Sequence, residues 1–189
     1  AKFQLRKIRS NCLDVIQSLA ESDRASLQES KILGTIYDEN TDTFCLSFST
    51  LLKQAKAPEV TKRIALSMHS SVFDPLGLGS PWHVWAKLLM QETWLTVKGG
   101  WNAVLPPDLQ QKWREWASSA EAMVDFKVPR SIAPCEEPYR LHYFCDSSGK
   151  AFDATVYVQA IHDHTQVNLL CSKVKIIPLN MVGKISMPR

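Results

Sequence analysis

One carboxylate followed by two hydroxyl residues is the part of this sequence best suited to chemistry. Asp146 ends the apolar run 141–145 and precedes Ser147 and Ser148. Such a run predicts a strand covered on both faces, and a carboxylate at its end is costly without a partner. Because Asp oxygens are hard ligands, Asp146 is a candidate ligand for Mg²⁺ or Mn²⁺. An Asp that opens a turn before Gly149 is the commoner use of this pattern.

Hydrolysis of a phosphodiester by two metal ions needs several carboxylates around cations about 4 Å apart. Strand-like segments at 152–160 and 167–176 follow Asp146, and the sequence ends at Arg189 before another element adds a carboxylate. We therefore expect the first three antiparallel strands of a nuclease sheet, truncated before its active site is complete. The chain reads as a piece of something longer.

Two other sites are weaker candidates. Residues 146–149 read Asp-Ser-Ser-Gly, which resembles the Asp-Ser/Thr-Gly loop of aspartic peptidases with one extra serine. The extra serine displaces the glycine that lets that loop turn, and two such loops must share a proton. Residues 162–164 read His-Asp-His and could ligate a metal, but a solvated turn is favoured because no cysteine or further histidine lies nearby.

Composition limits the class of protein. The sequence has 189 residues, of which 45% are hydrophobic, enough for one large or two small folded domains. A net charge of +3 does not by itself indicate nucleic acid, although bases gather toward both ends. Five cysteines without C-x-x-C spacing indicate reduced thiols in an intracellular protein, with Cys45, Cys145 and Cys171 in strand cores. The sequence contains no run of about 18 apolar residues, so no membrane span is expected.

Periodicity predicts the elements that would position Asp146. Residues 31–37 and 43–48 alternate as a hairpin around a polar turn, and 2–9 form a weaker strand candidate. Helices are expected over 13–19, over 62–72 with Thr61 as cap, from Ser80 and Pro81 to the glycines at 99 and 100, and from 107 to about 124. Their tryptophans fall at helical spacing, which is more typical of packing than of base stacking.

Taken together, the motifs resemble the polyprotein of BEL/Pao-type LTR retrotransposons nearly end to end. The strongest blocks are Phe-Asp-Pro-Leu-Gly at 73–77 and Phe-Cys-Asp-x-Ser at 144–148, supported by Thr-Lys-Arg at 61–63 and Ser-Lys-x-Lys at 172–175. The sequence departs from the family at Asn102, where an Asp usually follows the Trp, and at Asp153 and Gln159 in the second strand.

The resemblance implies an α+β fold with three parts. Residues 1–126 would be the C-terminal part of a reverse transcriptase, with a primer-grip hairpin at about 31–48 and helical thumb and connection at about 60–125. Residues 127–139, rich in proline, would be a linker, and 140–189 the start of an RNase H-like domain. Asp146 would be its first catalytic, metal-binding carboxylate. Mg²⁺ or Mn²⁺ would belong to the complete domain, and none is expected to bind this fragment tightly.

The resemblance also implies nucleic acid as partner. A thumb would lie against the backbone of a primer–template RNA–DNA hybrid, and the segment 53–63 has four bases against one acid, Glu59. The expected nucleic-acid-binding residues are Lys53, Lys56, Lys62, Arg63, Lys173 and Lys175. The plainer alternative is a solvated helix start with Arg63 paired to Glu59.

The expected function is therefore a fragment of a retrotransposon reverse transcriptase and RNase H that holds primer–template. The parent would be an RNA-directed DNA polymerase and ribonuclease H, and the fragment alone would be inactive. The remaining polyprotein would be a partner, no membrane would be involved, and the location would be the cytoplasm, a virus-like particle or the nucleus. One alternative is an inert remnant that serves only as a structural or interaction module. Another is the segment labelled aspartic peptidase in such polyproteins.

Overall fold

Antiparallel sheets and a layer of helices make up the computed structural model, which describes residues 4–26, 31–32, 35–132, 138–162 and 166–181. The predicted mixture of helix and antiparallel sheet is confirmed.

The helices are α1 (Leu13–Ser18), α2 (Ser49–Ala55), α3 (Lys62–Ser70), α4 (Ser80–Thr96) and α5 (Pro107–Ser119). The strands are β1 (Lys31–Ile32), β2 (Thr35–Asp38), β3 (Thr43–Leu46), β4 (Val128–Pro129), β5 (Tyr139–Ser147), β6 (Ala151–Ala160) and β7 (Val167–Ile176). Short 3-10 turns occur at Glu21–Asp23, Ala120–Met123 and Leu179–Met181.

The first sheet, in the order β1-β2-β3-β4, contains the predicted hairpin. Charged side chains from the segment before β5 hold its turn. Lys127 Nζ lies 2.8 Å from Asp38 Oδ2, and this hydrogen bond lowers the pKa of Asp38 to about 2. Arg130 Nε donates to Asp42 Oδ1 at 2.6 Å. Within the expected linker 127–139, Val128 and Pro129 form β4 against β3, and Tyr139 begins β5. The assignment of this segment as a linker between domains stays a prediction.

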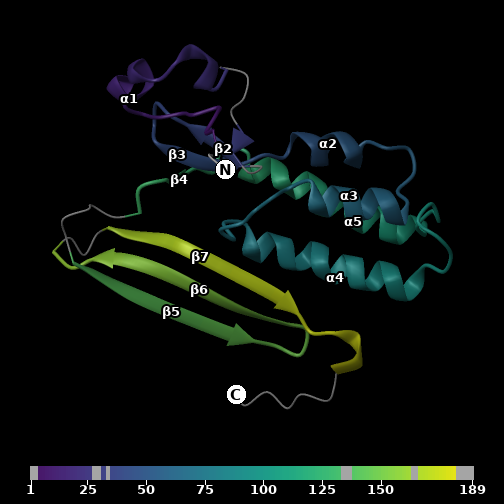
Figure 1. Ribbon diagram of the computed structural model, residues 1–189. Coiled ribbons are helices and arrows are strands. Elements are labelled where there is room, and N and C mark those ends of the chain that lie inside the picture. The colour runs from purple at the N-terminus through teal and green to yellow at the C-terminus, as the bar shows by residue number, and fades with distance from the viewer. Residues whose placement is uncertain (1–3, 27–30, 33–34, 133–137, 163–165, 182–189) are drawn as a thin grey trace.

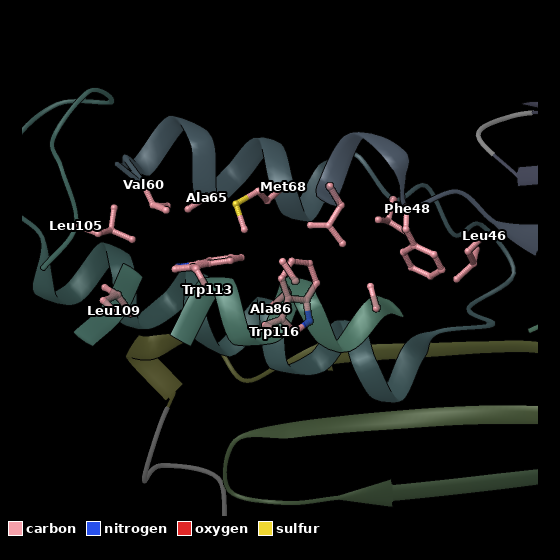
Figure 2. Packing of buried hydrophobic residues seen from close by; sticks show 14 of the residues in the cluster. Leu46, Phe48, Val60, Ala65, Met68, Ala86, Leu105, Leu109, Trp113 and Trp116 are labelled. Carbon is pink, nitrogen blue, oxygen red and sulfur yellow. The ribbon is translucent and has the colours of Figure 1, made fainter. Parts of the chain in front are cut away.

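Helices α2 to α5 enclose the main hydrophobic core. Trp113 of α5 is fully buried, and Figure 2 shows Ala65 and Met68 of α3 on the side facing it. Thr61 accepts a hydrogen bond from the backbone N–H of Ile64 at 3.3 Å, which confirms the predicted cap of α3. The prediction that tryptophans at helical spacing pack is confirmed for Trp113 and for Trp116, which is 6% exposed.

The second sheet has the order β5-β6-β7, and α4 lies along the free edge of β7 (Figure 1). Lys87 Nζ donates to the carbonyl of Val174 at 2.6 Å, and Gln91 Nε2 donates to the carbonyl of Ile177 at 3.0 Å. The N–H of Ser172 donates to the carbonyl of Leu76 at 2.8 Å. These contacts satisfy backbone groups of an edge strand and fix the sheet to the helices.

Strand β5 is the opposite edge, and its expected burial on both faces is wrong. Tyr143 is 67% exposed and Phe144 is 58% exposed, because within the described residues no layer covers this strand. Cys145 and Cys171 lie in strands as expected but are exposed, and Cys45 is half-buried. The apolar composition of residues 141–145 predicted a strand correctly, but it did not predict whether another layer packs against that strand.

The other differences are local. Residues 4–9 make only an isolated bridge, Ile8 to Arg24, instead of a strand. Helix α4 is capped at Gly79 instead of Ser80, and Pro81 lies in its first turn as expected. None of the helices in the described parts of the chain is both long and apolar enough to cross a bilayer.

Candidate metal and nucleic-acid site

Asp146 lies next to the end of β5, beside a tight hairpin turn. Its Oδ1 accepts a hydrogen bond from the backbone N–H of Ser147 at 2.8 Å, so the carboxylate has a fixed local partner. Ser148 closes the turn, because its Oγ accepts from the N–H groups of Lys150 and Ala151. Asp146 is exposed on an edge strand. The prediction that it ends the first of three antiparallel strands, open to solvent, is confirmed.

A second carboxylate, which the sequence analysis did not count as a site residue, faces Asp146. Asp153 of β6 is its direct partner in the β5–β6 register. Directly opposite residues lie on the same face of a sheet with Cβ atoms about 4.5–5.5 Å apart, where like charges repel. Neither carboxylate has an ion-pair partner within the described part of the chain. The pair therefore concentrates negative charge at one point of the sheet.

The register that creates this pair was readable in principle. Ser147 pairs with Phe152, which leaves a loop centred on Gly149 and Lys150. A tight turn at a glycine fixes which residues oppose each other in a hairpin. Counting outward from that turn would have placed Asp153 opposite Asp146.

The two carboxylates line one side of a cleft of about 380 Å³ between the sheet and α4. The helix side of this cleft is mainly apolar and includes Val84, Trp85 and Leu88 beside Ser80. Trp85 is 64% exposed, the most open of the tryptophans. The cleft thus places an exposed aromatic side chain in the same space as the carboxylate pair.

The donors fit a single hydrated divalent cation better than a pair of cations. Mg²⁺ is commonly held by one or two carboxylates and keeps several waters, and Asp146 with Asp153 supplies that number. Within the described ranges no group of three or more His, Cys, Asp or Glu residues is arranged to hold a metal. A two-metal centre needs more carboxylates than this cleft contains. Residues 163 and 164 of the His-Asp-His segment lie outside the described residues.

Lys62, unlike the other predicted nucleic-acid contacts, is buried. It is 3% exposed, its Nζ donates to the carbonyl of Gly99 at 3.1 Å, and it lies 4.6 Å from the centre of the Trp94 ring. A buried ammonium with these partners does not reach a phosphate. The basic residues around Lys62 in the sequence gave no sign of its burial, because that burial depends on a loop almost forty residues away.

The other predicted contacts are on the surface in two separate groups. Arg63 of α3 is exposed and donates to Asn102 Oδ1 at 3.1 Å, so the alternative pairing with Glu59 is not the one formed. The exposed lysines are Lys53 on α2, Lys56 just after it, and Lys173 and Lys175 on β7. These four lysines are accessible, and α2 and β7 lie apart in the fold (Figure 1).

Comparison with protein-family models identifies a family for this chain. Residues 61–189 match the Pao retrotransposon-like RNaseH-like domain, so α3 to α5 and the β5-β6-β7 sheet fall in one family region. Searches of the curated proteins and of the solved structures found no match. Because the matched region covers more than half of the sequence, this chain belongs to the Pao retrotransposon-like RNaseH-like family.

Proposed function

We propose that this chain is the part of a retrotransposon reverse transcriptase and RNase H polyprotein that contacts an RNA–DNA hybrid and contributes Asp146 as a metal-binding carboxylate. The observation that carries the proposal is the pairing of Asp146 with Asp153 across the β5–β6 hairpin, at the wall of a cleft. Among the described residues these two opposed carboxylates have no cationic partner, and such a pair forms a site that a divalent ion would stabilise.

Each side chain of the cleft has a distinct role in this proposal. Asp146 is oriented by the N–H of Ser147, and Asp153 supplies the second oxygen ligand. A bound Mg²⁺ or Mn²⁺ would supply positive charge to a phosphodiester oxygen. Trp85, exposed on the helix side, offers a flat apolar surface to a base or sugar. Further carboxylates would have to come from the rest of the polyprotein.

Duplex contacts in this proposal come from exposed bases only. Lys53, Lys56 and Arg63 form one group and Lys173 and Lys175 the other. Such contacts neutralise phosphates and position a duplex without reading its sequence. The resemblance of residues 31–48 and 60–125 to a primer grip, thumb and connection belongs to the same proposal, as does an intracellular location.

Metal binding is tested by adding Mn²⁺ to the ¹⁵N-labelled chain and recording paramagnetic broadening of its amide signals. We expect broadening centred on the β5–β6 turn that is lost in Asp146→Asn and in Asp153→Asn. Asp125→Asn is the matched control, because Asp125 is exposed and lies outside the cleft. Broadening that is absent, or that survives both cleft substitutions, would instead support an inert structural module.

A further inference from the structure

A second cavity lies across the α4–β7 junction from the carboxylate cleft. It has a volume of about 420 Å³ and shares Ser80, Ser172 and Val174 with the cleft. Its titratable lining residues are four with nitrogen-bearing side chains and one carboxylate: His69, Asp74, His83, Lys87 and Lys173. Neither the family match nor the proposed nuclease role gives this cavity a function.

His83 brings an unused polar atom to this cavity. The residue is 7% exposed, and its buried Nε2 has no hydrogen-bond partner. Asp74 Oδ2 lies 3.8 Å from this atom, beyond hydrogen-bonding distance, so it does not satisfy the nitrogen. A buried polar atom without a partner costs free energy, and a ligand oxygen that accepts from a protonated Nε2 would recover it.

Two lysines, Lys87 and Lys173, line the same cavity. Burial lowers the pKa of Lys87, and the nearby charge of Lys173 lowers it further. Neither amine forms an ion pair with a carboxylate among the residues described. Lys87 uses one N–H on the carbonyl of Val174, which leaves two for a ligand.

Asp74, the one carboxylate of the cavity, is already engaged. Its Oδ1 accepts from the N–H of Leu78 and its Oδ2 from the N–H of Gly79, both at 2.8 Å. It therefore closes the turn before α4 and only partly offsets the charge of the lysines. The cavity keeps a surplus of donors and of positive charge.

We propose that this cavity binds a phosphoryl group, with Lys87, Lys173 and the Nε2 of His83 as its donors. The chemistry is that of a compact tetrahedral anion with several acceptor oxygens. The group belongs either to free phosphate or to a nucleic-acid backbone. The inference does not rest on the proposed metal site, since it uses none of the carboxylates of the cleft.

The test uses the full chain and two probes, inorganic phosphate and a dinucleotide with one phosphodiester, each titrated by NMR against chloride at equal ionic strength. We expect the signals of His83 to shift with phosphate. Lys173→Gln should weaken binding about tenfold, which is the usual effect of losing one charge-assisted hydrogen bond. Lys98→Gln is the matched control, because Lys98 is exposed, does not line the cavity and is not one of the proposed duplex contacts.

The two probes distinguish free phosphate from a nucleic-acid backbone as the source of the phosphoryl group. Shifts with both probes indicate a site for a nucleic-acid backbone, and shifts with phosphate alone indicate a site for the free anion. Because Lys173 is exposed, its substitution tests the site without unfolding the chain. The inference is overturned if neither probe shifts His83 more than chloride does, or if Lys98→Gln weakens binding as much as Lys173→Gln.

Discussion

Gly77 touches the backbone of Ser172 so closely that no side chain fits between the helical layer and β7. A Cβ atom at Gly77 would overlap the carbonyl oxygen of Ser172, and the residue has a φ of 73°. The glycine ends the Phe-Asp-Pro-Leu-Gly block, and the preceding Leu76 accepts the N–H of Ser172. This turn therefore docks the sheet on the helices, which gives a packing reason for that glycine.

Replacing Gly77 by alanine should destabilise the chain strongly. The left-handed backbone costs about 1 kcal/mol for a residue with a Cβ, and the overlap with Ser172 raises the total loss to about 2–4 kcal/mol. Urea unfolding measures the free energy. Gly100→Ala is the control, because a Cβ there has open space around it, and it should change stability by less than about 0.5 kcal/mol. Equal effects of the two substitutions would contradict the docking role.

Removing one member of the Asp146–Asp153 pair should stabilise the metal-free chain. The two like charges oppose each other directly across the strands, so Asp153→Asn should raise the free energy of unfolding by about 0.2–1 kcal/mol at low salt. The gain should shrink as salt screens the repulsion. Unfolding at two salt concentrations checks this, and a loss of stability on Asp153→Asn would argue against repulsion.

Lys62 and Arg63 should behave differently although they are neighbours. Lys62→Met removes a buried hydrogen bond and the contact with Trp94, so stability should fall by about 1–3 kcal/mol. Its effect on the salt dependence of primer–template binding should be negligible. The double substitution of Lys56 and Arg63 by Gln should lower the log–log salt slope by about 1.8, which is roughly 0.9 for each phosphate contact. If the salt slope of primer–template binding changed with Lys62→Met but not with the double substitution of Lys56 and Arg63, Lys62 would be the phosphate contact instead.

Acid should destabilise the chain through His83. Burial lowers its pKa to about 4 in the folded state, against an ordinary value near 6.5. Between these two values the unfolded chain binds the extra proton, so stability present above about pH 6.5 is lost as pH falls toward about 4. The loss is at most about 3 kcal/mol. His83→Gln should flatten this pH dependence in urea unfolding, whereas the same change at the exposed His162 should leave it intact.

The chain alone should not cleave an RNA–DNA hybrid. Two carboxylates do not hold two metal ions in the geometry that hydrolysis needs, and the described residues offer no third ligand in the cleft. Incubation with labelled hybrid in Mg²⁺ or Mn²⁺ should give no product above background. Mg²⁺-dependent cleavage that disappears in Asp146→Asn would show that the site is complete.

Local sequence patterns determined the elements of this protein. Helical spacing of apolar residues predicted α3 to α5, the Thr61 cap set the start of α3, and the apolar run before Asp146 predicted β5. These features depend on residues a few positions apart, so hydrogen bonding within one element decides them. The exposed end position of Asp146 followed from the same pattern.

Only the tertiary structure determined which elements pack against one another. The burial of Lys62 depends on Gly99, the cover of the β7 edge depends on Lys87 and Gln91 of α4, and the cavity at His83 exists only where α3, α4 and β7 meet. Periodicity fixes which face of an element is apolar but not what covers that face, because contacts between distant segments depend on the packing of the whole chain.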